Sequence, residues 1–128
     1  MSGSDEERRH ALTDLLDLRL PVGAAVDAVR SIPWDSEVEL VSLDRASVLA
    51  LLQRYLQDEL TDADVEQWAN AIEGRDDIGL EAGYEEPLRT FVYEAANPAL
   101  VEPISKSAAY RWQHQLAEGP PPSSPADR

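Results

Sequence analysis

The segment from Thr61 to Gly74 carries the clearest start and stop signals for a helix in this chain. Thr61 suits the N-cap, because its hydroxyl can accept a hydrogen bond from a first-turn N–H that otherwise has no partner. Asp64 occupies the position from which a capping box returns the hydrogen bond, although that motif prefers Glu or Gln. Gly74 supplies the left-handed residue that commonly ends a helix. The apolar residues between them recur at helical spacing and line one face: Val65, Trp68, Ala69 and Ile72.

Trp68 is predicted to anchor a core through this face. Truncating a buried Trp to Ala typically costs about 3–5 kcal/mol, so one indole contributes much of a small core. The alternative is an exposed contact residue in an interface, where Trp is also enriched. Because Trp68 falls in line with Val65 and Ile72, the core interpretation is favoured.

Helical periodicity and boundary residues divide the rest of the chain into further short helices. Serines suit three of the starts, and prolines mark several boundaries. The link before Thr61 is short, so the helix ahead of it and the Thr61–Gly74 helix form an αα-hairpin. The predicted ranges of the other helices are 4–20, 21–31, 42–57, 84–96 and 105–118.

One segment, 37–43, reads E-V-E-L-V-S-L and is the only possible strand. Its alternation is imperfect and no second strand candidate is evident, so we interpret it as an extended connector and leave a strand as the alternative. Residues 75–83 are predicted to be a loop.

These patterns predict an all-α fold: residues 1–118 form a single compact bundle of five or six short helices, and the Pro/Ser segment 119–128 is a disordered tail. The chain has no run of eighteen apolar residues and no apolar signal-peptide core near its start. It also has no cysteine, which fits a cytoplasmic protein.

The formal net charge of −14 argues against several partners. Nucleic acid and anionic membrane surfaces both need Lys and Arg for binding, so we expect neither. A basic protein partner is favoured instead. The charge is concentrated, since residues 57–86 hold eleven acids and one base, Arg75. The alternative is a solvated acidic face that only keeps the protein soluble.

We therefore predict a partner-binding surface within this acidic region. Arg75 is expected to pair with Glu73 or another acid nearby and hold its loop in place. The loop acids are favoured because recognition residues gather on loops. Tyr84 and Trp34 are candidates for its rim. The predicted partner-binding residues are Asp58, Glu59, Asp62, Glu66, Glu73, Arg75, Asp76, Asp77, Glu81, Tyr84 and Glu85.

A catalytic or metal-binding constellation is not evident. His10 and His114 lie near opposite ends of the chain and lack a helical partner of the HExxH kind. The acids after Thr61 superficially resemble a calcium loop, but they lack its turn glycine. The helix that follows Thr61 carries four acids and no base, which excludes a helix-turn-helix DNA reader. We expect no enzyme activity, no cofactor and no metal.

One pattern runs through the predicted αα-hairpin, on Leu51, Leu52, Tyr55, Leu56, Leu60, Thr61, Val65 and Trp68. It resembles a pattern in bacterial immunity proteins of the colicin D and contact-dependent-inhibition type. In that family an apolar helix, a short turn and a second helix begin a small acidic bundle. The resemblance implies a protein that binds and blocks a nuclease toxin, with acids standing in for phosphates in the toxin's basic cleft. The resemblance covers less than a fifth of the chain.

These features favour an acidic immunity or inhibitor protein that docks on a basic cleft. Two rivals remain. A DNA mimic that inhibits a defence protein would display acids spaced like phosphates over a long face. A helical adaptor or regulatory subunit would bind its partner without dependence on salt.

Overall fold

The helix predicted after Thr61 is present in the computed structural model as α4 (Asp62–Ile72). Its capping box is complete: Thr61 Oγ1 accepts the Asp64 N–H at 3.1 Å, and the Thr61 N–H donates to Asp64 Oδ2 at 2.9 Å. Gly74 follows with φ +85°, the left-handed conformation expected just after a helix. Start and stop signals are therefore both confirmed.

The structure describes residues 2–118, with side chains described from residue 5 to residue 117. The predicted tail 119–128 lies outside this range. The fold is a compact helical bundle, as the sequence predicts, and its buried apolar residues form one cluster. The other helices are α1 (Ser2–Asp17), α2 (Val22–Arg30), α3 (Arg45–Leu56), α5 (Glu85–Ala96) and α6 (Lys106–Glu118).

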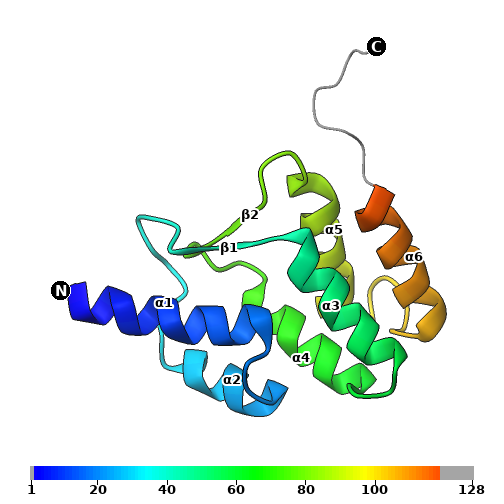
Figure 1. The fold of residues 1–128 in the computed structure, drawn as a ribbon, viewed down its shortest axis with the longest axis horizontal. Coiled ribbons are helices and arrows are strands. Elements are labelled where there is room, and N and C mark those ends of the chain that lie inside the picture. Colours follow the sequence, from blue (N-terminus) through cyan, green and yellow to red (C-terminus); the bar gives the residue numbers. More distant parts are fainter. Residues whose placement is uncertain (1, 119–128) are drawn as a thin grey trace, which may run out of the picture.

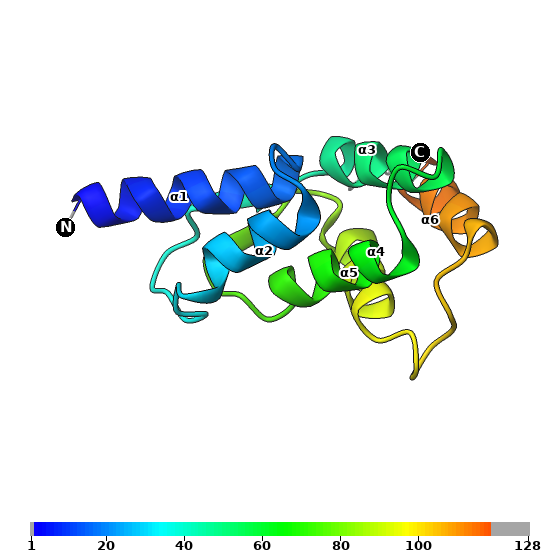
Figure 2. The same cartoon turned by 90° about the horizontal axis from the view of Figure 1, so that it is seen from below.

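The helices form an elongated bundle with α4 near its middle. Figures 1 and 2 show α1 and α2 toward one end, α6 toward the other, and α3, α4 and α5 between them. Helix α4 packs against both α2 and α5, while α3 packs against α6. None of the helices within the described range is long and apolar enough to cross a membrane.

Trp68 is buried at the centre of this bundle, as predicted. Its side chain is fully inaccessible, and its indole N–H donates to the Leu15 carbonyl of α1 at 2.8 Å. Its ring lies 6.1 Å from that of Phe91 on α5, which meets Trp112 of α6 edge-on at 5.1 Å. This aromatic row joins four helices, and each such pair contributes about 0.5–1.5 kcal/mol beyond area burial.

Two predictions about extended segments are wrong. Residues 41–43 form a strand, β1 (Val41–Leu43), and the predicted loop 75–83 contains β2 (Ile78–Leu80). The two strands pair in parallel, with Val41 opposite Ile78 and Leu43 opposite Leu80. Helices α3 and α4 provide the crossover connection that parallel strands require. The connector interpretation failed because it required a partner with its own visible alternation, which a three-residue strand cannot show.

Two helix boundaries also differ from prediction. The first helix ends at Asp17 instead of near Leu20, because Leu18 adopts φ +51° and the Arg19 N–H turns back to the Asp14 carbonyl. The third helix is capped by Asp44, whose side chain accepts the Ser47 N–H, since the predicted cap at position 42 belongs to β1.

Candidate functional site

Asp77 belongs to the protein interior, which corrects its place among the predicted surface residues. Its side chain is 0% exposed, immediately before β2. Arg75 approaches it with Nε 2.9 Å from Oδ1 and Nη2 3.1 Å from Oδ2, and Arg8 of α1 places Nε 2.9 Å from Oδ2. The prediction that Arg75 pairs with a nearby acid is confirmed, with Asp77 and not Glu73 as the partner.

The same two arginines fix the loop between α2 and β1. Arg8 Nη2 donates to the carbonyls of Pro33 and Asp35 at 3.0 and 2.9 Å, and Arg75 Nη2 donates to Pro33 at 3.0 Å. The Arg75 guanidinium also lies 5.0 Å from the Trp34 ring centre. We call Arg8, Arg75 and Asp77 the buried ion cluster. It joins α1, this loop and β2.

Burial alone would raise the pKa of Asp77, but its hydrogen bonds with Arg75 and Arg8 outweigh that effect and hold the pKa below its ordinary value. Asp77 is therefore a structural carboxylate that is buried and inaccessible to a partner. Its neighbour Asp76 is exposed, and within residues 5–117 its carboxylate has no hydrogen-bond or ion-pair partner.

Four predicted residues gather where α3 turns into α4, and we call them the corner acids: Asp58, Glu59, Asp62 and Glu66. Two of them are neutralised, since Asp58 pairs with Lys106 at 3.0 Å and Glu59 with Arg54 at 3.2 Å. Asp62 accepts the Tyr55 hydroxyl at 2.6 Å. Burial, followed by this hydrogen bond, raises the pKa of Tyr55 above its ordinary value.

Glu81 and Tyr84 form the turn between β2 and α5. Glu81 accepts the backbone N–H of Arg45 at 2.9 Å, and the Arg45 guanidinium lies 3.7 Å above the Tyr84 ring. Both side chains are half-buried, so they contribute to holding this turn against α3.

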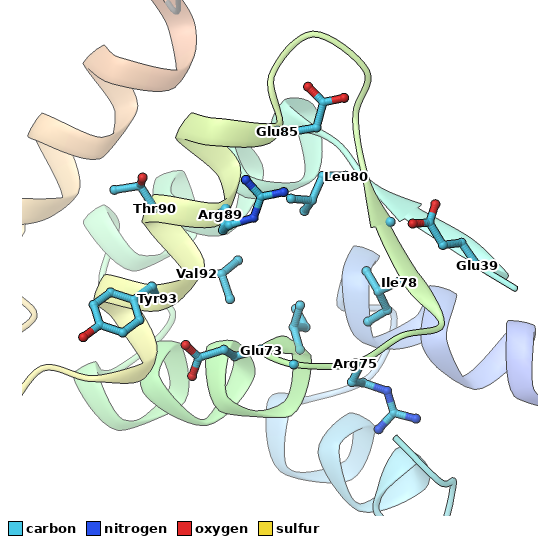
Figure 3. A pocket seen from close by; sticks show the side chains of 13 residues that line it. Glu39, Glu73, Arg75, Ile78, Leu80, Glu85, Arg89, Thr90, Val92 and Tyr93 are labelled. Carbon is cyan, nitrogen blue, oxygen red and sulfur yellow. The ribbon is translucent and has the colours of Figure 1, made fainter. Parts of the chain in front are cut away.

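A groove of about 780 Å³ lies between β2, α5 and the end of α4. Figure 3 shows it with Glu73 near one end, Glu85 near the other and Glu39 beyond β2. Apolar side chains from all three elements line it: Ile72, Ile78, Leu80 and Val92.

Three carboxylates at this groove have no ion-pair partner among the described residues, and we call Glu39, Glu73 and Glu85 the rim acids. Glu73 is near the side-chain amide of Asn97 at 3.4 Å, and Glu85 accepts the Gly83 N–H at 3.0 Å, both neutral partners. Glu39 lies directly over Gly79 of β2, a closeness that a Cβ at position 79 would prevent.

Sequence reasoning missed Glu39, because only the pairing of β1 with β2 brings it to the groove. Arg89, also on the rim, is paired with Glu86 at 3.3 Å. The predicted surface is thus divided: Glu73 and Glu85 belong to the groove, the corner acids lie elsewhere, and Asp77 is buried.

The Lys and Arg side chains of residues 5–117 all form ion pairs with carboxylates of the chain itself. Each Lys and Arg side chain in residues 5–117 lies within 4.0 Å of an Asp or Glu oxygen. Between residues 57 and 86 these pairs neutralise five acids: Asp58, Glu59, Asp77, Glu81 and Glu86. Six have no ion-pair partner among the described residues: Asp62, Asp64, Glu66, Glu73, Asp76 and Glu85.

Within residues 5–117, no group of three or more His, Asp or Glu side chains is arranged to hold a metal ion. His10 lies 3.5 Å from Asp14 on the exposed side of α1. Comparison of the chain with protein-family models, with curated proteins and with solved structures gave no match.

Proposed function

We propose that this protein is an acidic binding module that docks on a basic protein and blocks its surface. The observation that carries the proposal is that each Lys and Arg side chain in residues 5–117 forms an ion pair with an Asp or Glu of the chain itself. An approaching molecule therefore meets surplus carboxylate and no spare guanidinium or ammonium group in residues 5–117. Such a surface attracts cations and repels phosphate, so it favours a basic protein over nucleic acid.

The resemblance of the α3–α4 hairpin to immunity proteins gives this proposal its sharper form, in which the partner is a nuclease toxin. A nuclease needs a basic cleft to hold its substrate backbone, and surplus carboxylates are complementary to such a cleft. Long-range charge attraction would speed association, and a few desolvated contacts would set the dissociation rate.

The test is affinity capture from the native host with the purified chain as bait. We expect a protein with a strongly basic surface to be retained at about 0.05 M salt and released near 0.5 M, because the screening length falls from about 14 Å to about 4 Å. The captured protein, once purified, should lose any nuclease activity when the chain is added.

Two results would contradict the proposal. A captured partner without a basic surface, or retention that is unchanged by salt, would indicate an adaptor with incidental charge. Duplex DNA would compete for the captured partner whether the chain is an immunity protein or a DNA mimic. The nuclease assay therefore separates these two functions.

A further inference from the structure

Strand β2 has one paired edge and one free edge. The Asp77 carbonyl accepts the Val41 N–H at 3.2 Å, and the Glu81 N–H donates to the Leu43 carbonyl at 2.9 Å, so these groups point toward β1. Successive backbone groups of a strand alternate in direction, so Ile78 and Leu80 direct their N–H and C=O groups to the opposite edge. No hydrogen bond to these four groups is found in the described chain.

This free edge borders the groove that α5 closes on its other side (Figure 3). An edge strand with free N–H and C=O groups is a template for another strand, and proteins normally cover or charge such edges. Here the edge is recessed beside a cavity of about 780 Å³, within the range of about 300–1,000 Å³ typical of ligand sites.

The lining of the groove defines what kind of segment fits. An extended peptide points successive side chains in opposite directions, so one alternate set would meet Ile72, Ile78 and Val92. The other set would face the solvent side, where Glu73 and Glu85 stand near opposite ends of the groove (Figure 3). Alternating apolar and basic residues are complementary to this arrangement.

We propose that the groove binds an extended basic segment of the partner protein, which adds to β2 as a third strand. Main-chain hydrogen bonds to Ile78 and Leu80 would supply sequence-independent affinity, while the apolar lining and the rim acids would select the side chains. This inference rests on the proposed function, because it takes the partner to be basic.

The probe is an acetylated hexapeptide of alternating Lys and Val. Two control peptides replace Lys by Glu, or carry N-methyl groups on alternate residues so that they cannot donate to β2. We expect the Lys/Val peptide to slow amide hydrogen exchange at Ile78 and Leu80, followed by NMR. The N-methylated peptide should bind at least tenfold more weakly, and the Lys-to-Glu peptide should not bind detectably.

A matched pair of protein variants locates the charge effect. Glu73→Gln with Glu85→Gln removes two rim acids and keeps their hydrogen-bond acceptors, and we expect it to weaken the Lys/Val peptide about tenfold. Glu59→Gln with Glu66→Gln removes two corner acids and should change the affinity less than twofold.

The outcomes separate this inference from the proposed function. Binding of the Lys/Val peptide without protection of Ile78 and Leu80, or equal losses in the two double variants, would overturn the groove site while leaving an acidic binding module. Equal binding of the Lys and Glu peptides would overturn the basic character of the segment that the groove binds, whereas salt-independent capture of the partner would overturn the proposed function. Protection of the same amides by raising the concentration of the chain alone would show that the occupant is a second copy.

Discussion

Asp76 and Asp77 are adjacent, yet they belong to two regions with opposite properties. Asp77 lies in the buried ion cluster, where both carboxylate oxygens bind arginine. Asp76 lies outside that cluster and is exposed, as are the rim acids Glu39 and Glu85. A run of acids in the sequence is therefore not one surface, since some of its charges hold the fold and others remain for a partner.

The physical cause of the difference is desolvation. A buried carboxylate is stable only when paired and hydrogen-bonded, so Asp77 requires both of its arginines. Rim acids stay hydrated and need no partner, which leaves their charge available. The ion cluster is buried, whereas the rim acids Glu39 and Glu85 are exposed, so variants can address each separately.

The largest expected effect is that of Asp77→Asn. It would leave the Arg75 side chain, which is 1% exposed, without its counter-charge. Removing one member of a buried ion pair typically costs about 3–5 kcal/mol. We expect a loss of this size in the free energy of unfolding, measured by urea denaturation with circular dichroism.

The neighbouring Asp76→Asn is the matched control, and we expect it to change the free energy of unfolding by less than about 0.5 kcal/mol. Similar losses in both variants would break the distinction between the two regions.

Lowering the pH should remove part of the stabilisation that ionised Asp77 gives to the fold. Because the pKa of Asp77 in the folded chain is below its ordinary value of 3.8, ionised Asp77 stabilises the fold above that pH. The contribution is lost as the pH falls below 3.8 toward the folded pKa. Urea denaturation at neutral pH and at about pH 3 should show a smaller gap between the wild type and Asp77→Asn at the acid pH, since other carboxylates cancel in the difference. A constant gap would contradict the pairing.

Arg8→Ala should have a smaller effect than Asp77→Asn, because Asp77 keeps Arg75. The variant removes one charged hydrogen bond to Asp77, a kind that contributes about 1.5–3 kcal/mol. It also removes two exposed hydrogen bonds to loop carbonyls, which water can replace. We expect a total loss of about 2 kcal/mol in thermal or urea unfolding. Arg9→Ala, at an exposed site on the same helix, should cost less than about 1 kcal/mol.

The smallest expected effect is that of Glu73→Gln with Glu85→Gln. Both side chains accept hydrogen bonds from neutral groups, which glutamine can also accept. The free energy of unfolding should change by less than about 0.5 kcal/mol per site, measured by urea denaturation. A loss above about 2 kcal/mol would show that these acids, like Asp77, support the fold.

Most of the helical framework is predictable from the sequence, because its signals are local. The capping box at Thr61, the glycine at position 74 and the spacing of Trp68 each act within a few residues. Ser105 likewise accepts the Ala108 N–H at 3.1 Å, as expected of an N-cap.

The sheet and the division of the acids are not predictable in the same way, because both depend on contacts between distant residues. Strands of three residues carry too little alternation to be recognised, and parallel pairing places the partner beyond two helices. Asp77 differs from Asp76 through Arg8, which lies 69 residues away in the chain. Glu39 reaches the groove through the pairing of β1 with β2.

The positions of the three tryptophans give the molecule built-in optical reporters. Trp68 and Trp112 are at most 1% exposed in the helical core, whereas Trp34 is 46% exposed beside Arg75. A soluble quencher such as acrylamide would reach Trp34 in the native state and reach the other two when the core opens. Loosening around the buried ion cluster can therefore be followed by fluorescence separately from global unfolding.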